Sequence, residues 1–415
     1  MRRAWPLLAS VFCGSTATLL GVTVLGKQVY DLTHRELDLG LLGLVEFAPA
    51  ALLVLVTGAV ADRFDRRRVA IIASLGEAST ALALAAYTAT DPTAAGPIFA
   101  IVFVFGIARA FVAPASRALP ADIVSADKLP ALVARTSIAW QSAIVVGPVL
   151  GGFLYAADPV LPYLAMAGLL VVAAGSMALL QVDARPHALT IDAGPSTTTP
   201  GQTEVAAPKA TLHQALEGLR FIRHKPVLLG AISLDLFAVL FGGAVALLPA
   251  IADQRLGVGA VGLGWLRAAG GIGAGLVTLR LAFRPITRRV GTTLLGTVAL
   301  FGGFTIVLGT TTSYTVAFVA LAALSGADAI SVFVRATLVP LVTPNDMRGR
   351  VLAVENVFIG ASNELGAFES GVAGELLGSS GAIVLGGVAT LAIALVWARV
   401  FPSLRHIDTF PAKPL

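Results

Sequence analysis

The amino-acid sequence predicts an all-α membrane protein, with twelve transmembrane helices in two six-helix bundles related by pseudo-two-fold symmetry. The first observation behind this prediction is composition. Of the 415 residues, 56% are hydrophobic and only 13% are charged, whereas soluble domains have about 25% charged residues. A soluble fold of this size cannot bury so much apolar surface, but lipid can cover it. The other two observations are the length of the apolar runs and a single polar segment that divides them.

The apolar runs have the length that a membrane requires. A hydrocarbon core of about 30 Å is crossed by about 20 residues of helix. The sequence predicts spans at 6–30, 38–61, 69–90, 96–116, 133–157, 160–181, 226–252, 260–283, 289–311, 314–341, 350–377 and 381–401.

Basic residues between these spans predict the topology. With the N-terminus placed in the cytoplasm, the cytoplasmic segments hold 23 of the 29 Lys and Arg residues, and the outer loops hold only Arg35 and Arg255. Such a bias predicts an even number of spans, with both termini inside. It also argues against a basic nucleic-acid binder, because the basic residues alternate with apolar spans. A cleaved signal peptide over residues 1–27 is disfavoured, since no small-residue cleavage site precedes a soluble domain.

The polar segment predicts the domain organisation. Residues 183–212 are rich in Ala, Thr, Pro and Gly and contain no apolar run, as is typical of a flexible linker. The following residues alternate apolar and basic faces and predict a short helix on the inner membrane surface. We therefore expect an N-terminal bundle over 1–181, a cytoplasmic linker with its surface helix over 182–225, a C-terminal bundle over 226–401 and a cytoplasmic tail over 402–415.

A charged motif follows the second span. The segment GAVADRFDRRRV contains Gly58, Asp62, Arg63, Arg66 and Arg67. A carboxylate at the C-terminal end of a helix opposes the helix dipole and requires a basic partner. The motif resembles the cytoplasmic loop signature of the major facilitator superfamily, which implies a cytoplasmic gate that stabilises the outward-facing state. The alternative is a basic loop that serves topology alone.

The fifth span contains a small-residue motif. Gly147, Pro148, Gly151 and Gly152 permit close helix packing and a bend. They resemble the signature of drug and proton antiporters of this superfamily, although an ordinary packing face would use the same residues. Stretches in spans 7 and 11, SLDLFAVLFGGAVALLPAIA and RGRVLAVENVFIGASNELGAFESGVAG, are similar to the enterobactin-exporter group, which is related to macrolide and multidrug exporters.

Ionisable residues inside the spans are functional candidates, because charge is costly in a bilayer. The sequence has eight acidic and four basic residues of this kind: Glu46, Glu77, Asp235, Asp328, Glu355, Glu364, Glu369, Glu375, Lys27, Arg109, Arg267 and Arg335.

Helical spacing in the eleventh span predicts a polar band. Glu355 and Glu369 share one face, and Asn356 and Asn363 lie beside it. Such a band cannot face lipid, so we expect it to line the transport cavity. Glu364 lies roughly opposite Glu355 and is expected to contact another helix.

Two further spans supply candidates for proton coupling. Asp328 and Arg335 share a face but lie two helical turns apart, about 10 Å along the axis, so Arg335 is expected to meet a carboxylate of span 11, such as Glu355. A fixed structural pair is the alternative. Asp235 precedes a predicted helix break at the Gly242–Gly243 pair and could carry a proton, contact a cationic substrate or simply bond a neighbouring helix.

Two residues of the first bundle complete the candidate site. Arg109 occupies the place of an arginine that, by the resemblance, contributes to proton coupling in many antiporters. Glu46 could reach Lys27 and form an outer gate.

These observations predict the function class. The resemblance implies a proton-coupled exporter of siderophore-like or amphipathic drug-like molecules, with an importer or uniporter of the same fold as the alternative. The sequence has no Walker loop, so an ion gradient or facilitated diffusion is the expected energy source. No enzyme site, cofactor or metal site is expected, and a channel is less consistent with charges scattered over many helices. We expect a monomer in the bacterial inner membrane whose partners are a small-molecule substrate, protons and lipids, with no nucleic acid.

Overall fold

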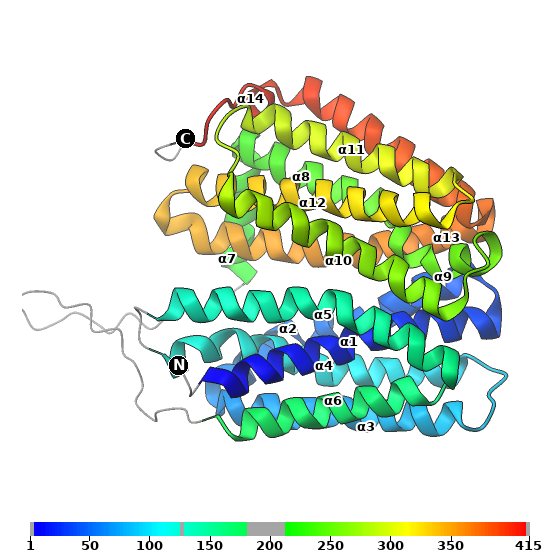
Figure 1. The fold of residues 1–415 in the computed structure, drawn as a ribbon. Coiled ribbons are helices and arrows are strands. Elements are labelled where there is room, and N and C mark those ends of the chain that lie inside the picture. Colours follow the sequence, from blue (N-terminus) through cyan, green and yellow to red (C-terminus); the bar gives the residue numbers. More distant parts are fainter. Residues whose placement is uncertain (1–3, 125–127, 181–211, 412–415) are drawn as a thin grey trace, which may run out of the picture.

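A computed structural model describes residues 4–124, 128–180 and 212–411 (Figure 1). Within these ranges the regular structure is helical and there is no strand. The all-helical fold predicted from the sequence is therefore confirmed.

Six helices precede the linker. They are α1 (Trp5–Thr33), α2 (Glu36–Arg63), α3 (Arg66–Thr88), α4 (Gly96–Ile123), α5 (Leu129–Ala157) and α6 (Leu161–Ala178). Proline occupies the first turn of α1, α4, α5 and α6, where its missing N–H costs no helical hydrogen bond.

The chain after the linker begins with α7 (Leu212–His224) and α8 (Pro226–Phe241), followed by the short elements η2 (Ala244–Leu247), α9 (Leu248–Ala250) and η3 (Ile251–Arg255). The remaining helices are α10 (Gly259–Phe283), α11 (Val290–Thr310), α12 (Tyr314–Val342), α13 (Asn345–Val400) and α14 (Pro402–Arg405).

Glycine interrupts two of these elements. The helix break predicted at the Gly242–Gly243 pair is confirmed, because α8 ends at Phe241. Within α13, Gly378 has a φ of 73°, a left-handed value at which two helices meet. This break falls between the predicted spans 350–377 and 381–401.

Nine helices in the described part of the chain are long and apolar enough to cross a membrane. The chain is thus a multi-pass membrane protein. The predicted number of twelve spans is not confirmed. One reason is that Asn345–Val400 counts as one of the nine helices despite the break at Gly378. The twelve-span count and the division into two six-helix bundles stay predictions.

The packing of the helices follows the order of the chain. In Figure 1, α1–α6 lie together in the lower part of the view, and α8 and α10–α14 lie together in the upper part. The two sets meet chiefly where α2 packs on α13 and α5 packs on α10. One hydrophobic cluster also joins them, since Tyr30 of α1 and Leu39 of α2 pack with Leu247 and Leu266.

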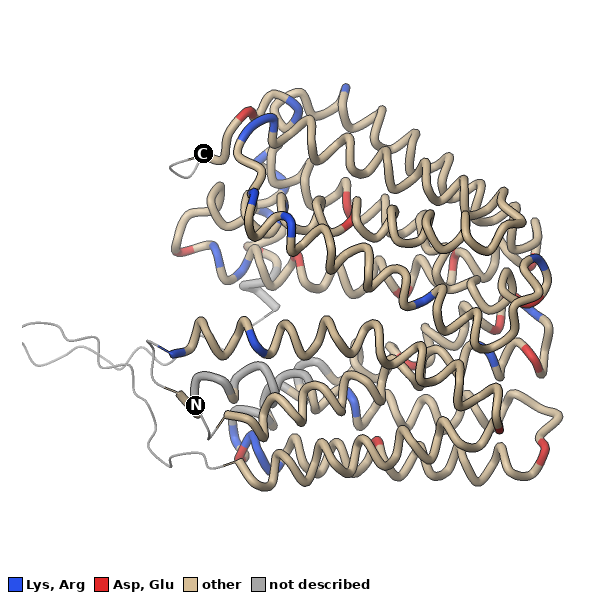
Figure 2. Tube along the Cα trace, in the orientation of Figure 1, with Lys and Arg blue, Asp and Glu red and all other residues tan. Residues whose placement is uncertain are grey.

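The two ends of the molecule differ in charge. The N and C marks of Figure 1 lie at one end, and Figure 2 shows that most Lys and Arg residues gather near it. We call this the terminal end and the opposite one the distal end.

The short helix α7 matches the prediction for residues after the linker, while the linker residues 182–211 lie outside the described part of the chain. Ile222 of α7 is buried, whereas Leu216 and Leu219 are exposed. Glu217 pairs with Arg350 of α13 at 2.6 Å between Oε2 and Nη1. The ion pair therefore attaches the helix to α13, and Ile222 joins a hydrophobic cluster that includes Val351 of α13.

Candidate functional site

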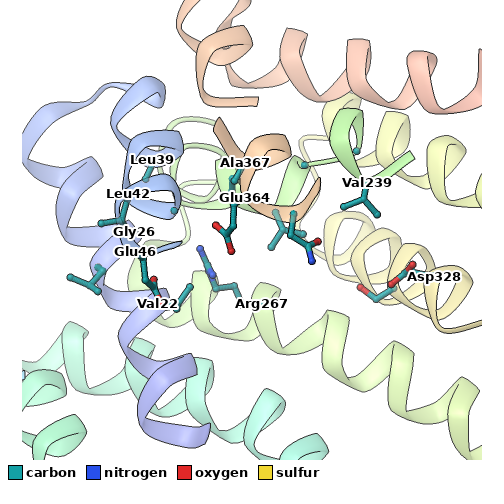
Figure 3. A pocket seen from close by; sticks show the side chains of 18 of the residues that line it. Val22, Gly26, Leu39, Leu42, Glu46, Val239, Arg267, Asp328, Glu364 and Ala367 are labelled. Carbon is teal, nitrogen blue, oxygen red and sulfur yellow. The ribbon is translucent and has the colours of Figure 1, made fainter. Parts of the chain in front are cut away.

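A cavity of about 410 Å³ lies between the two sets of helices. Its wall contains residues of α1, α2 and α4 from one set and of α8, α10, α12 and α13 from the other. Much of the wall is apolar, and five ionisable side chains interrupt it: Glu46, Arg109, Arg267, Asp328 and Glu364. Figure 3 shows Arg267 between Glu46 and Glu364, with Asp328 at the other side of the cavity.

Glu46 and Arg109 form an ion pair on this wall. Oε1 of Glu46 lies 3.0 Å from Nη1 of Arg109. The contact is ionic and does not have hydrogen-bond geometry, because this buried nitrogen has no hydrogen-bond partner in the described part of the chain. The guanidinium also lies 6.0 Å from the ring centre of Phe105. Both candidates are thus brought together, from α2 and α4.

The predicted pairing of Glu46 with Lys27 is wrong. Lys27 pairs instead with Asp31, four residues along α1, and its Nζ lies 3.6 Å from Oδ1 of Asp253 in η3. The two residues lie at different levels along the helix axes, because Lys27 is near the distal end of α1 and Glu46 is closer to the middle of α2. Lys27 therefore links the two sets of helices at the distal end.

A second ion pair lies deeper in the protein. Oδ1 of Asp235 on α8 is 2.6 Å from Nη2 of Arg335 on α12, and both side chains are almost fully buried. Ser331 accepts a further hydrogen bond from Nε of Arg335 at 3.4 Å. The expectation that Arg335 pairs with span 11 is thus wrong, because the direct partner comes from α8. Glu355 is buried close enough to act on Arg335 electrostatically.

Asp328 stands between the two sites. It lines the large cavity and also a small one, of about 10 Å³, that it shares with Asp235 and Ser331. No ion pair or hydrogen bond of its carboxylate occurs within the described residues. Asp328 therefore lies next to the buried Asp235–Arg335 pair.

The polar band predicted in the eleventh span only partly lines the cavity. Asn363 does so, but Glu355, Asn356 and Glu369 are not among the lining residues. Asn356 is exposed and donates a hydrogen bond to the carbonyl of Leu352 at 2.9 Å.

Glu364, expected on the opposite face, lines the cavity instead. A Cβ added to Gly43 of α2 would lie 2.9 Å from Oε2 of Glu364, so the glycine gives the carboxylate room. The expected contact of Glu364 with another helix is confirmed, because Gly43 belongs to α2. The expected position away from the cavity wall is wrong.

Arg267 is the residue that sequence reasoning missed. It was recognised as a charge within a span, but nothing in its spacing assigned it to the site. Its Nε is buried without a hydrogen-bond partner, and no carboxylate of the described residues lies within ion-pair distance of its guanidinium. It points into the cavity from α10 (Figure 3).

The motif after the second span is described only in part. The surroundings of Gly58 and the side chain of Asp62 lie outside what the structure describes, so the predicted gate is untested. Arg63 is exposed, and Arg67 donates a hydrogen bond to the carbonyl of Ala178.

Asp65, within the same motif, caps α3. Its Oδ1 accepts the backbone N–H groups of Arg67 at 2.9 Å and Arg68 at 3.2 Å.

The small-residue motif of α5 packs against two helices. A Cβ on Gly147 would lie 2.9 Å from the carbonyl oxygen of Thr16 in α1, and Gly151 faces the same helix. On the other side, a Cβ on Gly152 would lie 2.5 Å from the carbonyl oxygen of Ala260 in α10. Pro148 lies inside α5, and its carbonyl would be 2.5 Å from a Cβ on Gly264. Gly147 and Gly151 thus pack on α1 within one set, whereas Pro148 and Gly152 are part of the α5–α10 contact between the two sets of helices.

The distal end of the cavity is closed by a second glycine contact. A Cβ on Gly371 of α13 would lie 2.9 Å from the Cα of Gly40 in α2. Next to it, Nε of Arg35 lies 3.3 Å from Oε1 of Glu375, and Gln254 donates a hydrogen bond to Tyr30. Backbone contact and polar bridges therefore hold the two sets together at this end.

The helices, the cavity between two sets and the glycine contacts correspond to a known family. Residues 7–367 match the family model described as the Major Facilitator Superfamily. The chain belongs to this superfamily. The resemblance noted in the sequence is therefore confirmed, and the chain is a membrane transporter rather than an enzyme.

Several superfamily members are similar over nearly the whole chain. An uncharacterized MFS-type transporter, YfiS of Bacillus subtilis, is 26% identical over 97% of this chain and 95% of its own. The enterobactin exporter EntS of Escherichia coli K12 is 24% identical, covering 98% and 95%.

Solved structures support the fold. A bacterial homologue of the lysosomal transporter Spinster, in an inward-facing and unoccupied conformation, has a TM-score of 0.69 at 15% identity, covering 97% of this chain and 96% of its own. The nucleoside transporter NupG has a TM-score of 0.69 at 12% identity, covering 96% and 100%. Relatives with different transport tasks share this superfamily fold, so the cargo must be inferred from the cavity.

Proposed function

We propose that this protein is a secondary active transporter that exports small molecules, siderophore-like or amphipathic and drug-like, by proton-coupled alternating access. The observation that carries the proposal is the charged cavity between the two sets of helices. Its size lies within the range of about 300–1,000 Å³ that small-molecule sites occupy. Its wall draws on both sets, so a movement of one set against the other would change access to it.

The contacts at the distal end support alternating access. The Gly40–Gly371 contact and the Arg35–Glu375 and Lys27–Asp253 pairs all join α1 or α2 to the second set of helices. These contacts would have to separate for the cavity to open at this end. The Arg35–Glu375 pair is exchangeable, since a partly exposed pair contributes only about 0–1 kcal/mol.

The proposed orientation places the distal end outside the cell. The cluster of basic residues at the terminal end favours the cytoplasm for that end, by the positive-inside rule (Figure 2). In this orientation the described form is closed to the outside, both termini are cytoplasmic, and the membrane is the bacterial inner membrane. We further propose that the protein is a monomer with twelve spans in two bundles, and that its partners include protons and lipids.

Proton coupling is assigned to carboxylates at the cavity. Glu46, Glu364 and Asp328 line it and could exchange protons with water there. Asp235 and Glu355 are further candidates through their closeness to Arg335. Protonating a carboxylate would release its arginine, and this release would permit the two sets to move. Glu369 and Asn356 are secondary candidates, because they do not line the cavity in this form.

Export rather than import is the finer proposal. It is supported by the antiporter-like motif of α5, whose Pro148 and Gly152 take part in the α5–α10 contact, and by similarity to the enterobactin exporter. An importer or uniporter of the same fold is the second candidate.

The test is transport by purified protein in proteoliposomes with a pH-sensitive dye inside and an imposed pH gradient. Catecholate siderophores and cationic dyes would be tested as cargo. We expect cargo movement that is accompanied by proton movement in the opposite direction. Cargo movement without proton flux would contradict proton coupling. Cargo movement only in the direction that corresponds to import would favour the importer. The matched control is the Arg280→Gln variant, since Arg280 is exposed at the end of α10.

A further inference from the structure

Arg267 is a cation without a counter-ion at the wall of the cavity. It lies on α10, in the middle of the protein, and its Nε is buried. The other two arginines of the membrane interior are each paired with a carboxylate, Arg109 with Glu46 and Arg335 with Asp235. Arg267 alone among the three has no carboxylate within 4.0 Å in the described part of the chain.

An arginine in this position requires a partner. Guanidinium stays protonated in proteins, so Arg267 cannot become neutral to reduce the cost of burial. A buried charge without an opposite charge is strongly unfavourable. An anion beside Arg267 would therefore reduce the cost of placing this charge at the cavity wall.

Two sources of that anion can be compared. Glu364 lies on the same cavity wall, but its Oε2 lies against Gly43 of α2 and it forms no ion pair with Arg267 within the described residues. Glu46 already faces Arg109. The other source is the cargo, and here the surroundings of Arg267 are suited to a ligand. Its guanidinium faces the cavity (Figure 3), and a Cβ added to the neighbouring Gly26 of α1 would meet Nη2 at 3.5 Å, an ordinary contact distance.

We propose that Arg267 binds an anionic group of the cargo, so that the transported molecule is an amphipathic organic anion. The carboxylate, sulfonate or phenolate of such a molecule would take a forked hydrogen bond from the guanidinium. Its apolar part would contact Leu25, Val239 and Phe301, which line the same cavity. This assignment rests on the proposed transport function and narrows its substrate class.

The test compares two probes that differ only in charge. Dansylglycine carries a carboxylate, and dansylglycinamide replaces it with a neutral amide on the same apolar frame. Binding of each to the purified protein in detergent is measured by calorimetry, with empty micelles subtracted. We expect the wild-type protein to bind the carboxylate about tenfold tighter than the amide, as one charge-assisted contact would give.

Three variants test whether the preference for the carboxylate arises from Arg267. Arg267→Gln is expected to lose the preference for the carboxylate and to bind the amide as before. Arg267→Lys keeps a positive charge and should retain about a third of the preference, because lysine lacks the planar fork. Arg280→Gln, on the same helix but exposed, should behave as wild type.

Other results would overturn the proposal. A wild-type protein that binds both probes equally has no anion site at Arg267. An Arg267→Gln protein that keeps the preference places the site elsewhere. If Arg267→Gln instead lowers the melting temperature and Glu364→Gln restores it, Arg267 is a structural partner of Glu364.

The binding test separates this inference from the proposed function. Binding in detergent requires neither a gradient nor a direction of transport. A protein that selects the carboxylate through Arg267 but does not export in proteoliposomes would contradict the proposed function and leave the anion site standing. A protein that exports cationic or neutral cargo but does not prefer the carboxylate probe would support the proposed function and contradict the anion site.

Discussion

The ion pairs Asp235–Arg335 and Glu46–Arg109 have the same chemistry in two different settings. In the first, the atoms are 2.6 Å apart and the side chains are 8% and 5% exposed. In the second, the atoms are 3.0 Å apart and the side chains of Glu46 and Arg109 are 18% and 39% exposed. The first pair joins α8 to α12 away from the large cavity, whereas the second lies on the cavity wall.

The difference in exposure decides what each pair can do. A desolvated pair with close contact resists exchange, because separating it leaves two charges in a low-dielectric environment. A pair beside a cavity is partly screened, and water, a proton or a charged ligand can replace either partner. We therefore regard Asp235–Arg335 as the more permanent pair and Glu46–Arg109 as the exchangeable one.

Removing one member of the buried pair is expected to have the largest effect. Arg335→Met leaves the Asp235 carboxylate without a cation, and loss of one partner of a buried pair typically costs about 3–5 kcal/mol. Thermal unfolding in detergent, followed by circular dichroism, measures the loss as a lower melting temperature. The Asp235→Asn/Arg335→Met double variant should recover part of it. A single variant as stable as wild type would contradict the permanent pair.

The sequence predicted the fold better than these pairs, for a physical reason. Span length and composition follow directly from the solvent, and the break after α8 follows from the adjacent Gly242 and Gly243. Pairing depends on which helix stands opposite, and helical spacing gives only the face. Arg335 was thus assigned to the eleventh span although α8 supplies its partner.

The same limit explains the outcomes at the cavity. Glu364 was placed opposite the polar band because one helix was considered alone, while the position of α2 decides that it lines the cavity. Arg267 was missed because its distinguishing property is the lack of a partner. No spacing rule within α10 can report a missing neighbour, although an arginine inside a predicted span was the available signal.

The contact between Gly40 and Gly371 extends the comparison from ion pairs to the backbone. Gly371→Val would insert a side chain where a single Cβ already lies 2.9 Å from the Cα of Gly40. Overpacking of this kind costs about 1–3 kcal/mol, so the distal closure should lose population to a form open at that end. Spin labels at positions 38 and 376 would then show a longer distance distribution than in the unsubstituted protein.

A matched glycine controls for the substitution itself. Gly296 of α11 is exposed, and a Cβ there would meet nothing within 4 Å. Gly296→Val should leave the label distances unchanged. An unchanged distance in both variants would show that the glycine contact does not hold the distal end closed.

Neutralising the exchangeable pair should affect transport more than stability. Glu46→Gln keeps the size of the side chain but removes the charge that faces Arg109. We expect the melting temperature to change little, because partly exposed pairs contribute about 0–1 kcal/mol, while the transport rate in proteoliposomes falls about tenfold, equivalent to 1.4 kcal/mol. A large fall in melting temperature without a transport defect would reverse the roles assigned to the two pairs.

The smallest effect is expected at the exposed bridge between Arg35 and Glu375. The side chains are 53% and 35% exposed, so water and salt compete with the contact between them. Glu375→Gln should reduce closure of the distal end by about 0.2–1 kcal/mol, and 1 M salt should produce the same shift in the wild-type protein. Label distances at low and high salt measure both, with labels at positions 38 and 376 so that neither bridge residue is replaced. If the shift in Glu375→Gln exceeded that in Gly371→Val, the polar bridge rather than the glycine contact would be the main closure.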